Sequence, residues 1–306
     1  MKLSIVTPMY GSASFLAEFY SRCCAAAAAL TDTFELIFVN DGSLDGSLEV
    51  AVSLFESDPR VKVIDLSRNF GHHKAMMTGL AHSRGDWVFL IDCDLEITPD
   101  VLAEFHACAQ RTGADVAFGV QASRKDSLPD RLLGEAFYMA FNWLSSDPLP
   151  RNLTSVRLMS RRYVDALVAH KEREVLIAGL WVITGFKQVP VTVTKASKRR
   201  TTYNLRRKLA VAVNAVTSFS NRPLVLIFYL GALISLLSGV AAVVLVVRRL
   251  FFGYLLEGWP SLIVSVWLLG GLTIFCLGVI GIYLSKIFIE TKQRPYTIIR
   301  RIYEHP

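Results

Sequence analysis

The sequence is poor in the features that define several large protein classes. Its five cysteines are odd in number and show no C-x-x-C spacing, so we expect no disulfide framework and favour a reducing compartment. No G-x-G-x-x-G follows the first expected strand, which disfavours a dinucleotide-dependent dehydrogenase. The N-terminus, MKLSIVTPMY, lacks the apolar core and cleavage site of a signal peptide. The compositional marks of nucleic-acid modules are also missing, so no nucleic acid is expected as a partner.

Charged residues are scarce in the last third of the chain. The protein has 306 residues, a net charge of +7 and 52% hydrophobic residues, with a mean hydropathy of +0.39. The apolar excess lies after about residue 223, in two runs at 224–247 and 261–284. Each run is roughly 24 residues long, enough for a helix to cross a hydrocarbon core of about 30 Å. Buried core helices are the alternative, disfavoured because such helices seldom run this long without a charge.

The short segment between these runs predicts an antiparallel pair of transmembrane helices within residues 223–288. Basic residues gather outside the pair, so the positive-inside rule places both termini in the cytoplasm. We therefore expect a multi-pass protein of the plasma (cell inner) membrane, with a cytosolic domain at 1–202 and a basic cytosolic tail at 289–306. Residues 203–222 show helical amphipathic spacing, which suits a helix on the bilayer surface or one packed on the soluble domain. Glycines in the spans allow close helix packing and are compatible with a homo-oligomer.

The first 202 residues alternate strand and helix patterns, which predicts an α/β domain built on a mostly parallel sheet. Short apolar runs rich in β-branched residues predict strands at 3–7, 35–40, 61–65, 87–91 and 115–119. Helical patterns lie between them at 14–30, 44–55 and 73–81, and another runs from Pro99 to Gln110. Ligands of such sheets bind at the carboxyl ends of the strands.

Polar turns follow three of the expected strands. They are Thr7-Pro8-Met9-Tyr10, Asn40-Asp41-Gly42-Ser43 and Asp92-Cys93-Asp94-Leu95-Glu96. Because the strands are expected to be parallel, these turns should converge on one crevice. The adjacent His72 and His73 lack a metal-chelating spacing, and we expect them at the start of a helix, near a bound diphosphate.

The acidic turn predicts a site for Mg²⁺ or Mn²⁺. Asp92 and Asp94 lie two residues apart, and Glu96 is close enough to add a ligand or orient a water. Hard carboxylate oxygens suit these ions, and Mg²⁺ usually keeps waters and substrate phosphates as its remaining ligands. Such an ion would neutralise charge on a leaving nucleoside diphosphate. The alternative is an ordinary solvated turn, where Asp is common.

The ordered motifs resemble the polyisoprenyl-phosphate glycosyltransferases, which are family 2 inverting enzymes of the GT-A fold. Dolichyl-phosphate mannose synthase and the bactoprenol glucosyltransferases are of this type. The resemblance covers nearly the whole chain and rests on VTPMYGSASFL, IFVNDGSLDGS, SRNFGHHKAMMTGL, IDCDLEITPDVL, the Arg157–Arg162 segment, SFSNRPL and QRP. Departures from the family pattern include Asn40 for an Asp, Glu96 for a Gln, Gln121 for an Arg and Ile282 for a Glu.

This resemblance implies roles for individual residues. Those expected to bind the nucleotide-sugar are Pro8, Tyr10, Asp41, Asp92 and Cys93. Asp94 would bind the metal, with Glu96 and Asp92 beside it. The implied reaction transfers a sugar, with UDP-glucose as the first guess for the donor, to an undecaprenyl or dolichyl phosphate.

The expected acceptor sets what the remaining residues must do. A phosphate monoester is largely dianionic at neutral pH and needs no strong general base, but it does need cations to position it. Arginine suits this because its planar fork matches phosphate. The candidates are Arg124, Arg131, Arg157, Lys198 and Arg200, with Arg131 and Arg200 preferred. The alternative for each of them is an ordinary solvated charge on the surface. Lys198 and Arg200 could also bind anionic lipid headgroups.

Two other functions remain open from the residues. A membrane glycosyltransferase with a glycan acceptor would need a catalytic base, and a processive one usually carries Q-x-x-R-W; neither follows the fifth expected strand. A non-catalytic nucleotide-sugar-binding subunit is the third possibility, and the intact pair of Asp92 and Asp94 argues against it.

Overall fold

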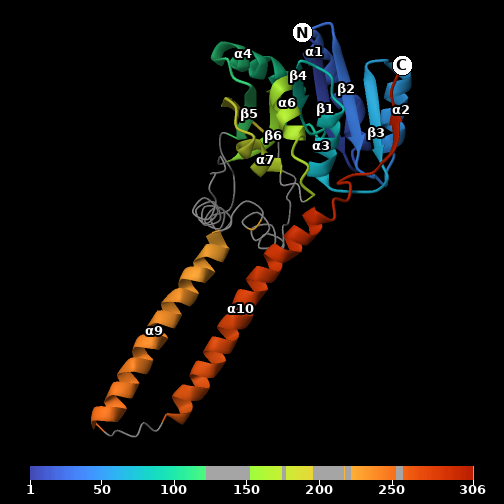
Figure 1. Ribbon diagram of the computed structural model, residues 1–306. Helices are drawn as coiled ribbons and strands as arrows, with labels where there is room; N and C mark the ends of the chain where they lie inside the picture. The colour runs from blue at the N-terminus through green and yellow to red at the C-terminus, as the bar shows by residue number, and fades with distance from the viewer. Residues whose placement is uncertain (122–151, 174–176, 196–216, 218–221, 253–257, 306) are drawn as a thin grey trace. The chain divides into compact units, whose positions relative to one another are not determined.

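The computed structural model describes residues 1–121, 152–173, 177–195, 217, 222–252 and 258–305 (Figure 1). The chain forms two compact units. The first contains the described residues up to 195 and those from 293 onwards, and the second contains the described residues between 206 and 292.

The first unit is built on an eight-stranded sheet with the order β7-β5-β6-β4-β1-β2-β3-β8. Four of its strand pairs are parallel, namely β1 with β2, β1 with β4, β2 with β3 and β5 with β7. The strands are β1 (Leu3–Met9), β2 (Phe34–Asn40), β3 (Val61–Leu66), β4 (Trp87–Leu90), β5 (Val116–Gln121), β6 (Leu153–Ser160), β7 (Gln188–Val193) and β8 (Ile299–Tyr303). The mostly parallel sheet expected from the sequence is confirmed.

Helices cover both faces of this sheet (Figure 1). On one face, side chains of α1 (Ala13–Ala28), α2 (Ser47–Ser57) and α4 (Leu102–Thr112) join the main hydrophobic core. On the other face, α3 (His72–Ala81) packs on β1 and β2, and α6 (Arg161–Val168) packs on β4 and β6. A 3₁₀ turn, η1 (Pro99–Val101), precedes α4, and α7 (Ile177–Ile183) follows α6. All seven residues of β1 are buried, as expected for a central parallel strand covered on both faces.

The expected elements up to residue 121 lie close to the observed ones, but three strands were not predicted. The first, β6, runs antiparallel between β4 and β5, with Leu90 opposite Arg157. Its insertion brings residues from beyond position 150 beside the end of β4. The other two, β7 and β8, form the two edges of the sheet.

The strand β8 lies in the segment for which the sequence suggested a basic tail. It pairs antiparallel with β3, with Ile64 opposite Ile302. Two buried side chains of β3 have charged partners in the segment: Lys62 Nζ lies 3.0 Å from Glu304, and Asp65 lies 3.3 Å from Arg300. Residues 299–303 are therefore part of the sheet that carries the site.

The second unit consists of α9 (Arg222–Phe252) and α10 (Trp259–Thr291), which contact each other. By length and composition both are able to cross a membrane, with mean hydropathies of 2.4 over Arg222–Ala241 and 2.2 over Ser265–Thr291. The runs expected to span, 224–247 and 261–284, fall inside them. Most of the segment expected to be amphipathic, 203–222, lies outside the described residues.

Candidate active site

Asp41 joins the end of β2 to the loop that precedes α3. Its Oδ1 accepts the N–H of Phe70 at 2.7 Å and its Oδ2 accepts the N–H of Gly71 at 3.0 Å. Burial raises the pKa of Asp41, although these two N–H groups oppose the shift. Gly42 follows with φ of +67°, and a Cβ there would lie 2.5 Å from the backbone carbon of Arg68. Only glycine fits this turn without displacing the loop.

Asn40, which departs from the family pattern, has a structural explanation. Its Nδ2 donates to Asp65 Oδ1 at 2.8 Å, and its Oδ1 accepts the N–H of Ser43 at 3.1 Å. Asp65 is buried, so an aspartate at position 40 would place a second carboxylate against it. The amide supplies the donor that Asp65 needs while keeping the turn beside Asp41 in shape.

Asp92 is held from two sides at the end of β4. Ser155 Oγ on β6 donates to its Oδ2 at 2.5 Å, and His72 Nε2, in the first residue of α3, lies 3.2 Å from its Oδ1. Burial raises the pKa of Asp92, but His72 and Ser155 outweigh it, and the net shift is downward. Burial likewise lowers the pKa of His72, while Asp92 and its acidic neighbours raise it above the ordinary value. Both shifts favour an ionic contact between a carboxylate and an imidazolium.

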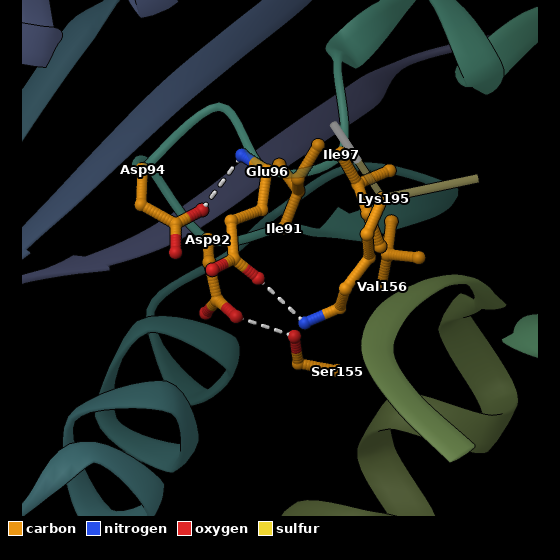
Figure 2. A pocket seen from close by; sticks show the side chains of 8 residues that line it. All are labelled: Ile91, Asp92, Asp94, Glu96, Ile97, Ser155, Val156 and Lys195. Atoms are coloured by element: carbon orange, nitrogen blue, oxygen red, sulfur yellow. Dashed lines mark hydrogen bonds and ion pairs between the residues drawn. The ribbon is translucent and has the colours of Figure 1, made fainter. Parts of the chain in front are cut away.

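The acidic turn folds back at Leu95, whose φ is +56°. As a result Asp92, Asp94 and Glu96 line one pocket, with Ile91, Ile97, Ser155, Val156 and Lys195 as its other lining residues (Figure 2). The N–H of Glu96 donates to Asp94 Oδ1 at 3.0 Å. Burial raises the pKa of Asp94, and the charges of Asp92 and Glu96 raise it further. The carboxylates therefore repel one another, and a cation placed among them would be stabilised.

Lys195 supplies one cation to this pocket. Its Nζ lies 2.7 Å from Glu96 Oε2 (Figure 2). Lys195 lies two residues beyond the end of β7, at the far side of the sheet from β1. The sequence assigned it no role, because β7 was not predicted and the place of Lys195 beside a strand end was therefore not apparent.

The donor chemistry of the pocket fits a divalent cation that shares its ligands with a substrate. Within the described residues, no three acidic, histidine or cysteine side chains gather closely enough to form a complete metal site. Mg²⁺ and Mn²⁺ do not require such a cage, since waters and phosphate oxygens complete their coordination. Asp94 Oδ1 accepts one backbone N–H, and Asp92 Oδ2 accepts the Ser155 hydroxyl. The buried Asp92 Oδ1 lies 3.2 Å from His72 Nε2 but has no hydrogen-bond partner among the described residues, so each aspartate keeps an oxygen for a cation.

Arg157 lies on β6 and is buried, with 1% of its surface exposed. Its guanidinium carbon lies 3.2 Å from the ring centroid of Trp181 on α7. Burial lowers the pKa of Arg157 to about 9, so it remains charged at neutral pH. Its Nε and Nη1, and the Nε1 of Trp181, have no hydrogen-bond partner among the described residues. These donors are chemically suited to an anion.

The first turn contributes one exposed aromatic side chain. Tyr10 follows β1 with 53% of its surface exposed, so its ring is not part of the core. Pro8 is buried in β1, and its carbonyl oxygen accepts the Cys93 thiol at 3.4 Å. The Cys93 side chain points into the core, so any contact of this residue with a ligand would come from its backbone.

The turns expected to converge do so. The N–H of Asp41 donates to the carbonyl of Met9 at 3.0 Å, and Cys93 bonds to Pro8, which links all three turns. His72 begins α3, as expected, and contacts the acidic turn. Four of the cations expected at a lipid phosphate, Arg124, Arg131, Lys198 and Arg200, lie outside the described residues.

Comparison with known proteins gives a consistent result. The family described as "Glycosyl transferase family 2" matches residues 4–165. A Mycobacterium tuberculosis protein described as a glycosyltransferase is 58% identical over 99% of this chain and 89% of its own. The "Prophage bactoprenol glucosyl transferase homolog" of Escherichia coli is 31% identical over 99% of each chain. The mannosyltransferase PcManGT from Pyrobaculum calidifontis, solved with GDP-Man and Mn²⁺, has a similar fold, with a TM-score of 0.50 at 15% identity over 95% of this chain and 86% of that one.

Proposed function

This chain belongs to glycosyl transferase family 2, and on that premise we propose that it transfers a sugar from a nucleotide-sugar to a polyisoprenyl phosphate with inversion at the anomeric carbon. The observation that carries the proposal is the acidic pocket of Asp92, Asp94 and Glu96. It lies at the strand ends of a chain that also contains two long apolar helices. Similarity to a bactoprenol glucosyl transferase homolog over the full chain supports a lipid carrier as acceptor.

The donor binds across the turns after β1, β2 and β4. Tyr10 offers an exposed ring for stacking on the base, and Asp41, fixed by two backbone N–H groups, keeps lone pairs for the ribose or base. Pro8 and the backbone of Cys93 border the same crevice. UDP-glucose is the first donor to test.

Asp94, with Glu96 and Asp92 beside it, holds Mg²⁺ or Mn²⁺. When bound, such an ion offsets the negative charge that develops on the leaving nucleoside diphosphate. His72 and Ser155 keep Asp92 ionised and oriented on the diphosphate side of the pocket.

The acceptor phosphate attacks the anomeric carbon directly. Its oxygen is anionic at neutral pH, so positioning by cations replaces general-base catalysis. Arg157 is the described candidate, since its Nε and Nη1 have no partner among the described residues. Arg124, Arg131, Lys198 and Arg200 are the other proposed contacts. In this proposal α9 and α10 anchor the protein in the plasma membrane, with the catalytic unit and both termini in the cytoplasm, and a homo-oligomer is compatible with the glycines of the spans.

The test is transfer of label to lipid. Membranes containing the protein are incubated with undecaprenyl phosphate and a panel of radiolabelled nucleotide-sugars, UDP-glucose first, and the lipid extract is counted. We expect one donor to label a lipid, and Asp94→Asn to abolish the labelling. Asp165→Asn, at an exposed carboxylate on α6, is the matched control and should retain it. Absence of labelled lipid with every donor would overturn the proposal.

A further inference from the structure

The contact between Lys195 and Glu96 joins two distant parts of the sequence at the acidic pocket. The two residues are 99 positions apart, and their charged atoms lie 2.7 Å from each other. Lys195 arrives from β7, whereas Glu96 belongs to the turn after β4. Figure 2 shows the ammonium group joined to Glu96 among the residues that line the pocket. Side-chain exposures of 36% and 29% leave both groups accessible to a ligand.

The ammonium group acts on more than its hydrogen-bonded partner. Asp92 and Asp94 line the same pocket as Lys195, so its positive charge also acts on these two carboxylates. Among the described residues that line this pocket, Lys195 is the one basic side chain. It therefore compensates part of the charge that a divalent cation would compensate when bound to the same carboxylates.

A lysine and a divalent cation cannot share Glu96 without mutual repulsion. Like charges a few ångströms apart repel strongly at a partly desolvated site. A lysine side chain, with its four-carbon stem, is able to move several ångströms while its backbone stays in place. The nearest new anion would then be the diphosphate of a donor bound at the same pocket.

We propose that Lys195 is the counter-ion of Glu96 in the absence of a metal. When a divalent cation binds, the ammonium group of Lys195 leaves Glu96 and contacts the diphosphate of the donor. The second half of this inference rests on the proposed function. Lys195 thus weakens binding of the cation alone and strengthens binding of the cation together with a nucleotide. By linkage, the cation and the nucleotide each raise the affinity for the other by the same factor.

The test measures binding rather than turnover. Full-length protein in detergent is titrated with Mn²⁺, alone and with saturating UDP or GDP, and free Mn²⁺ is followed by electron paramagnetic resonance. The variant is Lys195→Gln, and Lys171→Gln is a matched control at an exposed lysine in the segment after α6. We expect Lys195→Gln to raise the affinity for Mn²⁺ alone about five-fold, the size expected for removal of one nearby charge. The affinity for nucleotide in the presence of Mn²⁺ should fall by a similar factor.

A second variant separates the pair from a general charge effect. In a Glu96→Gln background the ammonium group has no carboxylate partner at that position, so Lys195→Gln should change the Mn²⁺ affinity much less. Unchanged or weakened Mn²⁺ binding in Lys195→Gln would overturn the inference, because an ordinary surface ion pair predicts that result. Wild-type protein that binds no Mn²⁺ in either condition would overturn it too, together with the metal assignment. If Lys195→Gln binds Mn²⁺ more tightly but the wild-type protein labels no lipid, the counter-ion role of Lys195 is supported. The same result contradicts a polyisoprenyl phosphate as the acceptor.

Discussion

His72 Nε2 lies 3.2 Å from Asp92 Oδ1, while Ser155 Oγ donates to the other oxygen of the same carboxylate. Asp92 is thus oriented by α3 on one side and by β6 on the other. Asp94 accepts one backbone N–H among the described contacts and has more capacity left for a cation. The two aspartates of the acidic turn therefore differ in their surroundings: Asp92 is fixed between two side chains, and Asp94 has one backbone contact.

Replacing His72 by glutamine should lower transfer without unfolding the protein. The imidazolium keeps Asp92 ionised and oriented, and groups that orient a metal-site carboxylate typically contribute 10–100-fold to activity. We expect kcat to fall by about this factor, with little change in the thermal unfolding temperature. His106→Gln, on α4 at the opposite face of the sheet, is the control. Equal activities in the two variants would remove His72 from the site.

Replacing Arg157 by methionine should separate activity from stability. A buried cation without an acidic partner is costly, and substitution of such a charge by an apolar side chain is often neutral or stabilising. Arg157 has no hydrogen-bond partner at Nε and Nη1 among the described residues, so we expect an unchanged or higher unfolding temperature. Transfer should fall at least ten-fold if the guanidinium binds a phosphate. A large loss of stability with normal turnover of the remaining folded protein would show that Arg157 is structural.

Asp58 should contribute stability that depends on pH. Arg60 donates to both of its oxygens and Tyr20 donates to Oδ2 at 2.7 Å, which lowers the pKa of Asp58 to about 2. Because the folded pKa lies below the unfolded one, the stabilisation is present above about pH 4 and is lost as the pH falls toward 2. Asp58→Asn should cost on the order of 1–2 kcal/mol at pH 7. Thermal unfolding at pH 7, 4 and 3 checks this: a difference from wild type that does not shrink at acidic pH would contradict it.

The strand β8 should stabilise the turn after β2, which begins at Asn40, through the buried Asp65. Arg300 pairs with Asp65 Oδ2, and Asn40 donates to Oδ1 of the same buried carboxylate. Arg300→Ala removes the partner of Asp65 Oδ2. A buried oxygen left without a partner should lower the free energy of unfolding by about 1–3 kcal/mol. We expect a lower unfolding temperature and weaker nucleotide binding. The neighbouring Arg301→Ala, whose side chain stacks on Tyr303, should change nucleotide binding little; equal losses in both variants would indicate a general effect of the strand.

The sequence was most informative where local pattern decides structure. Apolar β-branched runs placed the parallel strands up to residue 121, and the polar turns after them met as expected, because parallel strands end at one edge of the sheet. The family motifs also agree with the matched family and with the fold of the mannosyltransferase PcManGT.

The rest of the site depends on contacts between distant residues. No local pattern shows that β6 inserts antiparallel beside β4, and so Ser155 and the burial of Arg157 could not be predicted. The same holds for Lys195 and for β8, which reach the sheet from far along the chain. The sequence showed that Asn40 departs from the family pattern. The physical reason, its hydrogen bond to the buried Asp65, is apparent only in the folded structure.

The most direct measurement is the formation of a lipid-linked sugar by purified protein. The protein is reconstituted with undecaprenyl phosphate, UDP-glucose and Mn²⁺, and the lipid product is identified by mass spectrometry, with the nucleotide-sugar panel run beside it. We expect a polyprenyl-phosphate-linked hexose with wild type, and none with Asp94→Asn or after chelation of the metal. Normal product with Asp94→Asn would contradict the metal assignment. Sugar transferred to a glycan while the lipid phosphate stays unmodified would contradict the proposed reaction.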